Sequence, residues 1–201
     1  MGEGEDSMSL LDSDHLWIYR WSGSLNPLAR YEIRDAGDAI LGHAVEERPS
    51  VWMLALKVTR MRPMTPLVLL LRDASGFPVF SLVRSWDWWG TKPVEIQNAA
   101  GIPLLRFRSH GFLGHEVAIE DPFLGPIGKI RPLQVITLGD RRYEAQDPDG
   151  HPVASFRWIQ ESIWWPSRRC EVRVERGAWR ERWPFAPLAA ALMVALRVEA
   201  R

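Results

Sequence analysis

The amino-acid sequence predicts a mainly β protein, a twelve-stranded β-barrel of six hairpins that encloses a C-terminal apolar α-helix. Three observations lead to this prediction. A turn motif recurs with a period of about 25 residues, the segments beside the turns alternate between apolar and polar residues, and the last apolar segment has the composition of a helix. At 201 residues the chain fits one domain with a substantial core.

The recurring motif is an acidic or amide residue followed closely by glycine. Its clearest copies are Asp-Ala-Ser-Gly at 73–76, Asn-Ala-Ala-Gly at 98–101 and Asp-Pro-Asp-Gly at 147–150. Asp or Asn at the first position and Gly at the fourth are typical of a type I turn whose last residue is left-handed. The six units contain residues 31–37, 70–76, 94–101, 117–125, 143–150 and 170–177. Six hairpins make twelve strands, which is too many for a flat open sheet, so we expect a closed barrel.

The predicted strands alternate apolar and polar residues at a period of two. Val94 and Ile96, Tyr143 and Ala145, and Val172 and Val174 are examples, so one face of each strand is expected to be buried. An additional apolar stretch at 51–58 is interpreted as a strand extension, with a short helix as the alternative.

The segment 187–198 (PLAAALMVALRV) predicts a helix, because it is rich in Ala and Leu and begins with proline. It is apolar on nearly every side, so protein or lipid must surround it. Its length of roughly 18 Å is too short to span a bilayer. We therefore expect this helix to lie inside the barrel.

The N-terminal residues 1–14 are acidic and poor in apolar side chains, which predicts a disordered lead-in before a barrel domain at 15–201. They lack the apolar core of a signal peptide, and we expect a cytoplasmic protein that can be peripheral at a membrane. The single cysteine, Cys170, excludes an internal disulfide and reads as a small buried residue rather than a nucleophile. The net charge of zero gives no indication of nucleic-acid binding.

The order of several hairpins resembles a known family. Tyr31-Glu-Ile-Arg-Asp (31–35) with Gly42-His-Ala-Val-Glu-Glu (42–47), residues 66–73 with 79–84, residues 94–97 with 101–104, and residues 153–158 follow one another as in the phospholipid scramblase family and its LURP-one-related relatives. That family belongs to the tubby C-terminal-like superfamily. The resemblance implies twelve strands around a buried helix and binding of phospholipid at a membrane.

The chain departs from this family at the calcium segment. Scramblases carry acidic residues before the last strand and helix, whereas the corresponding residues 167–173 here read Ser-Arg-Arg-Cys-Glu-Val-Arg. Calcium takes six or more oxygen ligands, largely from carboxylates. We therefore expect neither a calcium site nor another metal or cofactor.

Tryptophan is unusually frequent, with eleven residues in the chain. One cluster, at 164–165, lies close in sequence to Arg168 and Arg169. The other, at 86–89, follows the second strand of another hairpin. The predicted lipid or membrane contact consists of Trp86, Trp88, Trp89, Trp164, Trp165, Arg168 and Arg169. Indole rings and cationic side chains favour the headgroup region of a bilayer. The alternative is that these indoles fill the ends of the barrel.

The arginine-rich stretch 168–182 also has two interpretations. Interleaved glutamates favour a solvated strand face with ion pairs, and a phosphate-binding patch is the alternative.

No motif of a known catalytic class occurs in the chain, so we do not expect an enzyme. The leading functional hypothesis is a scramblase-like domain that binds membrane phospholipids without calcium regulation. One alternative is a soluble binding module for a protein partner or a small hydrophobic ligand. A further alternative is a true phospholipid scramblase that moves lipids between leaflets.

Overall fold

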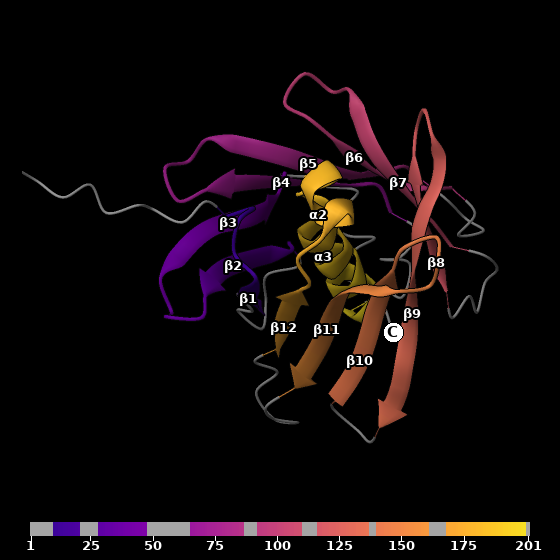
Figure 1. Cartoon of the computed structure of the whole chain (residues 1–201). Helices are drawn as coiled ribbons and strands as arrows, with labels where there is room; N and C mark the ends of the chain where they lie inside the picture. Colours follow the sequence, from indigo (N-terminus) through magenta and orange to yellow (C-terminus); the bar gives the residue numbers. More distant parts are fainter. Residues whose placement is uncertain are drawn as a thin grey trace, which may run out of the picture.

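Twelve antiparallel strands form a closed barrel (Figure 1). The computed structural model describes residues 10–20, 28–47, 65–86, 92–109, 116–136, 140–160 and 168–199. Each strand pairs with its neighbours in the chain, and the last strand pairs with the first. The strands are β1 (His15–Arg20), β2 (Arg30–Asp35), β3 (Ile40–Glu46), β4 (Leu67–Asp73), β5 (Pro78–Arg84), β6 (Val94–Gln97), β7 (Pro103–Ser109), β8 (Val117–Asp121), β9 (Gly125–Ile136), β10 (Asp140–Gln146), β11 (Pro152–Gln160) and β12 (Arg168–Val174).

Helix α3 (Ala186–Glu199) runs through the middle of the barrel, as Figure 1 shows in yellow. Its residues from Ala186 to Ala195 are all buried, on every side of the helix. This confirms the predicted barrel with an enclosed C-terminal helix. The structure also contains a short helix, α2 (Ala178–Arg182), which is not among the elements expected from the sequence.

The turn chemistry accounts for the hairpins. Gly76, Gly101, Gly125 and Gly150 have positive φ angles, as the turn motif requires. In the turn at 98–101, the amide of Gly101 donates to the carbonyl of Asn98, and the Asn98 side chain accepts from the amide of Ile102. Asp73 and Asp147 make the same bonds in their own turns.

The sixth predicted hairpin, at 170–177, is wrong in detail. Gly177 has an extended φ of 162° and precedes helix α2 instead of a second strand. The partner of β12 is β1, and the register pairs Cys170 with Ile18. The sequence period continued to Gly177, but the strand that completes the barrel is the first one in the chain.

The two ends of the barrel differ. We call the end that carries the five tight turns after β2, β4, β6, β8 and β10 the turn rim. The opposite end, where the odd-numbered strands finish, is the loop rim. Because β12 ends at the turn rim, α2 lies there too, in front of α3 in Figure 1.

The barrel begins before the predicted boundary at residue 14. Leu10 is buried in the core, and the carbonyl of Asp14 accepts a hydrogen bond from the amide of Val174. The last five residues of the predicted lead-in are thus held against the barrel, while residues 1–9 and the apolar stretch 51–58 lie outside the described residues. Within the described segments, every helix falls short of the length and apolar character needed to cross a membrane.

The turn chemistry leads to a stability prediction. Replacing Gly101 with alanine places a Cβ in open space but keeps a φ of +77°, which costs an L-residue roughly 1–2 kcal/mol. We expect Gly101→Ala to lower the free energy of unfolding by that amount in urea denaturation. Gly37→Ala is the control, because Gly37 does not have a positive φ. Equal losses in both variants would contradict the assigned turn geometry.

Candidate functional site

The predicted contact residues lie partly outside the described structure. Trp88, Trp89, Trp164 and Trp165 are not among the described residues. Trp86 is half-buried and follows the end of β5. Their proposed role as a lipid contact therefore stays a prediction.

The strands that precede the two predicted clusters, β5 and β11, finish at the same end of the barrel. The β5–β6 and β11–β12 connections both start at the loop rim, because odd-numbered strands run in the same direction. Four strands, β7–β10, separate them on one side, and β1–β4 separate them on the other. Strands β5 and β11 thus end on opposite sides of the same rim.

Arg169 belongs to the outer wall of the barrel. Its guanidinium lies over the ring of Trp17 on β1, at 5.0 Å from the ring centre. On the other side of β1, Arg34 lies over Tyr19 at 5.3 Å. The signal for this aromatic strip in the sequence is the alternation His15-x-Trp17-x-Tyr19, which marks one face of a strand.

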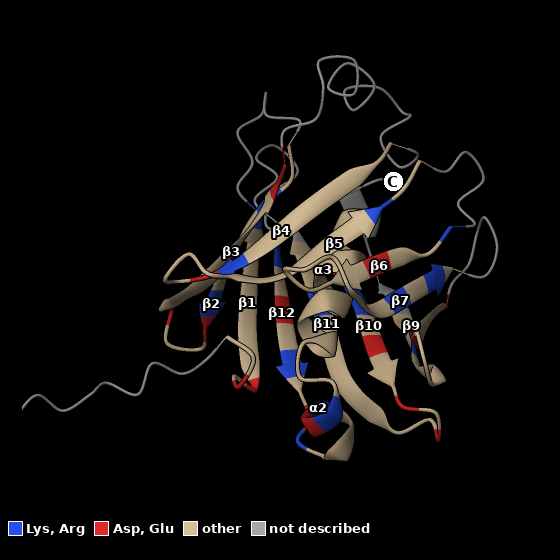
Figure 2. Cartoon of the chain, turned by 90° about the horizontal axis from the view of Figure 1, so that it is seen from above, with Lys and Arg blue, Asp and Glu red and all other residues tan. Residues whose placement is uncertain are grey.

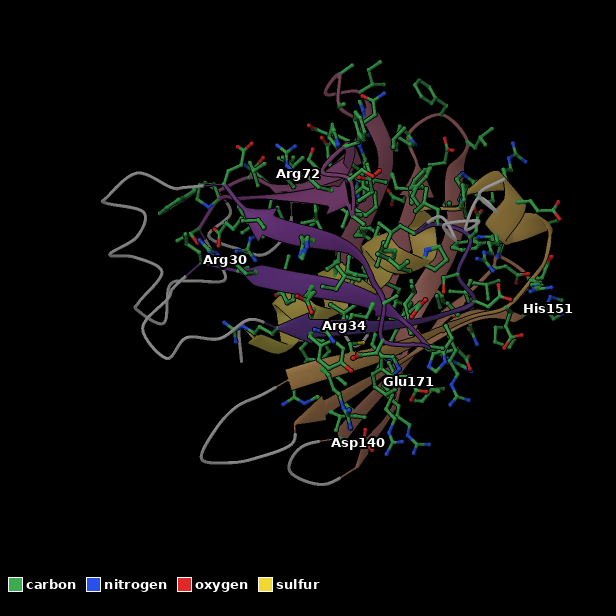
Figure 3. All side chains as sticks on the ribbon, turned by 90° about the vertical axis from the view of Figure 1, so that its left-hand side faces the viewer. Arg30, Arg34, Arg72, Asp140, His151 and Glu171 are labelled. Carbon is green, nitrogen blue, oxygen red and sulfur yellow. The ribbon has the colours of Figure 1, made fainter. Side chains whose placement is uncertain are left out.

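Ion pairs continue this outer wall. On β12, Oε1 of Glu171 lies 3.1 Å from Nε2 of His15 and 2.7 Å from Nη2 of Arg173. Figure 3 shows Arg34 and Glu171 on this face, with Arg30 at the other end of β2. The arginines of β12 whose side chains are described are thus engaged on the wall, in keeping with the solvated strand face considered for this stretch. The lone carboxylate of the segment 167–173, Glu171, is bound to two basic side chains.

Among the residues that the structure describes, the most exposed large apolar side chains lie at the turn rim. Phe77 is 69% exposed, Ile102 51%, Phe123 85% and Leu124 57%. They belong to the turns after β4, β6 and β8, which are consecutive around the barrel. We call these four residues the apolar tips. Large apolar side chains gathered on one surface are a feature of sites that contact membranes or proteins.

The turn hydrogen bonds explain why the apolar tips point outward. Phe77 and Ile102 each follow the turn glycine, and their amides donate to the side chains of Asp73 and Asn98. In the third turn, Asp121 accepts from the amides of Phe123 and Leu124. These bonds hold the backbone in the turn, beyond the ends of the strands, where the side chains of the apolar tips cannot reach the core. The sequence signal for this surface is an apolar residue beside a turn glycine, directly after it at Phe77 and Ile102 and directly before it at Leu124.

Helix α2 is fixed at the turn rim by two indoles. Trp179 donates through Nε1 to the carbonyl of Ile127 at 2.8 Å, and Trp183 donates to Asp121 Oδ2 at 3.1 Å. Partial desolvation raises the pKa of Asp121, but the hydrogen bonds from Phe123, Trp183 and Leu124 outweigh it and leave that pKa lowered. An ionised Asp121 therefore joins α2 to the turn that carries Phe123.

The segment before β1 is also held at the turn rim. Arg176 donates through Nε to Asp14 Oδ2 at 2.7 Å, and Arg180 donates to Asp14 Oδ1. The hydrogen bonds of Arg176 and then of Arg180 lower the pKa of Asp14 below its usual value. Figure 2 shows both signs of charge on α2 at this end of the barrel.

Two further groups of polar residues have simpler explanations. Asp147, Asp149 and His151 bring their ligand atoms within 4.8 Å of one another, but the amide of His151 donates to Asp147 as part of the turn. A shallow pocket of about 180 Å³ is lined by Arg30, Tyr31, Glu32, His43 and Val45. It is smaller than the roughly 300–1,000 Å³ that ligand sites usually occupy.

The chain matches no protein-family model, and it has no match among curated proteins or among solved structures. The barrel and its enclosed helix therefore rest on the geometry described above, and membership of a particular family remains a proposal.

Cys170 provides a test of the barrel interior. The thiol is fully buried on β12, and burial raises its pKa well above the ordinary value. We expect a thiol-specific reagent to modify the native protein only at the rate at which the barrel unfolds. Complete modification within minutes in native buffer, at a rate unaffected by added stabilising osmolyte, would contradict the buried position.

Proposed function

We propose that this chain is a non-enzymatic, scramblase-like domain that attaches to the surface of phospholipid membranes without calcium regulation. The proposal includes the phospholipid scramblase and LURP-one-related family to which the sequence motifs point. The observation that carries it is the row of apolar tips at the turn rim. A cytoplasmic protein that is peripheral at the membrane fits this surface.

The energetics of the apolar tips favour a membrane surface. Burial of one large apolar side chain contributes about 1.5–3 kcal/mol. Four such side chains at three consecutive turns can enter the interface together, while the turn backbone keeps its internal hydrogen bonds. The net charge of the chain is zero, so its overall charge adds no attraction to anionic lipid, and the apolar tips carry the attachment.

The proposal assigns the contact to the turn rim and not to the predicted tryptophan clusters. The two rims are at opposite ends of strands that are mostly about 20 Å long, so a flat bilayer can contact only one of them. Contact through Trp88 and Trp165, which follow in the sequence the strands β5 and β11 that end at the loop rim, remains the rival arrangement. A vesicle sedimentation assay with the variants Trp88→Ser and Trp165→Ser distinguishes contact through the loop rim from contact through the turn rim.

The residue composition of β12 supports the proposed absence of calcium regulation. The wall position of Glu171 and its two basic partners leave no group of carboxylates on the described part of that strand. Movement of lipids between leaflets is not part of the proposal.

A vesicle sedimentation assay tests the function. We expect the full chain to sediment with phosphatidylcholine vesicles, and Phe123→Ser with Leu124→Ser to weaken binding by roughly tenfold or more. Leu133→Ser is the matched control, because Leu133 is also an exposed leucine at 43% but lies on β9 away from the apolar tips.

Two results would contradict the proposal. Failure of the unmodified chain to bind either neutral or anionic vesicles would sink it and favour a soluble module for a protein or small hydrophobic ligand. An equal loss in the Leu133→Ser control would show that the apolar tips are not the contact.

A further inference from the structure

We infer that Arg176 and Arg180 form a binding site for the phosphomonoester headgroup of an anionic membrane lipid, and that the side chain of Asp14 fills this site when such a lipid is absent. The inference rests on the proposed membrane attachment, and it identifies the ligand chemistry at the turn rim.

The geometry of the two arginines is that of an anion site. Each oxygen of the Asp14 carboxylate takes one guanidinium: Arg176 reaches Oδ2 at 2.6 Å, and Arg180 reaches Oδ1. Two guanidinium groups that converge on one planar anion also suit a phosphate, which offers more oxygens and more charge. The Asp14 carboxylate therefore occupies the place of a phosphate.

The position of this pair matches that of the apolar tips. Helix α2 carries Arg180 and is joined to the turn of Phe123 through the bond between Trp183 and Asp121. When the apolar tips enter a bilayer, the arginines of α2 come to the level of the headgroups. Arg182, whose guanidinium lies over the Trp183 ring, adds a further positive charge, while Glu175 and Glu181 are exposed nearby in the sequence.

Asp14 can leave the arginines without unfolding the segment that carries it. Its side chain is 34% exposed and that of Arg176 is 84% exposed, so solvent reaches the pair and screens it. Other contacts keep the segment in place, since Leu10 is buried and the Asp14 carbonyl bonds to the amide of Val174. Only the Asp14 side chain has to move when a phosphate enters.

The low exposure of Arg180 explains why an anion must always be bound between the two arginines. Its side chain is only 12% exposed, and it also donates to the carbonyl of Leu11 at 3.1 Å. A partly buried guanidinium is costly without an anionic partner. Exchange of a carboxylate for a phosphate keeps this cation paired throughout.

The test uses the full chain and the variant Asp14→Asn. The control is Asp149→Asn, which removes the same charge from an exposed side chain at the same rim without touching the arginines. Binding is measured to vesicles of phosphatidylcholine alone, to vesicles that also contain phosphatidic acid, and to inorganic pyrophosphate in solution. Thermal melting of each variant establishes that it is folded.

We expect Asp14→Asn to bind vesicles with phosphatidic acid about three- to tenfold more tightly than the unmodified chain. Its binding to phosphatidylcholine alone should not change, and pyrophosphate should bind more tightly by a similar factor. Arg176→Gln, at a largely exposed position, should remove the preference for phosphatidic acid and leave binding to phosphatidylcholine intact.

The inference is overturned if Asp14→Asn changes neither vesicle nor pyrophosphate binding, or if Asp149→Asn produces the same gain. A gain with pyrophosphate but not with phosphatidic acid vesicles would overturn the assignment to lipid and identify a site for free phosphates. Failure of all variants to bind phosphatidylcholine, with the pyrophosphate gain retained, would instead count against the proposed function alone.

Discussion

Enclosure of an apolar helix by a closed wall of strands is the constraint on which the rest of this structure depends. Helix α3 is buried on all sides over ten consecutive residues from Ala186 to Ala195. A helix of this kind has no polar face to present to water, so the sheet must surround it. The fully buried alanines at 189–191 allow the wall to approach, and large side chains such as Trp158, Phe156 and Phe107 fill the remaining space.

Closure of the wall determines where the chain ends come together. The first and last strands must pair, so β1 lies beside β12, and the segments outside these two strands meet at the turn rim. Asp14 precedes β1, while Arg176 and Arg180 follow β12, and their contact is a consequence of this pairing. The candidate phosphate site is therefore assembled by the same pairing that completes the barrel.

The fold was predictable because its causes are local. Asp or Asn with Gly at a fixed distance specifies each turn, alternation specifies one buried face, and an apolar helix requires enclosure. The prediction of a turn at Gly177 was wrong because the pairing of the last strand is not determined locally. A glycine at the repeat spacing was read as a turn, but the residue has an extended backbone and leads into α2. Local spacing does not reveal that the last strand pairs with the first.

The candidate site was less accessible from the sequence. The tryptophan clusters stood out by composition, whereas Phe77 and Phe123 were hidden in turns whose chemistry was read only for backbone conformation. Asp14 was assigned to a disordered lead-in, because nothing local in an acidic segment shows that it meets arginines 162 and 166 positions later. Contacts across the whole chain require the three-dimensional closure before they can be seen.

Native-state hydrogen exchange of the backbone amides of α3 tests the central claim most directly. If the barrel encloses this helix, the amides between Ala189 and Ala195 should exchange only through global unfolding, with the same denaturant dependence as those of β1 and β12. Exchange of the α3 amides by a separate opening of much lower free energy, while β1 and β12 remain protected, would contradict the enclosure.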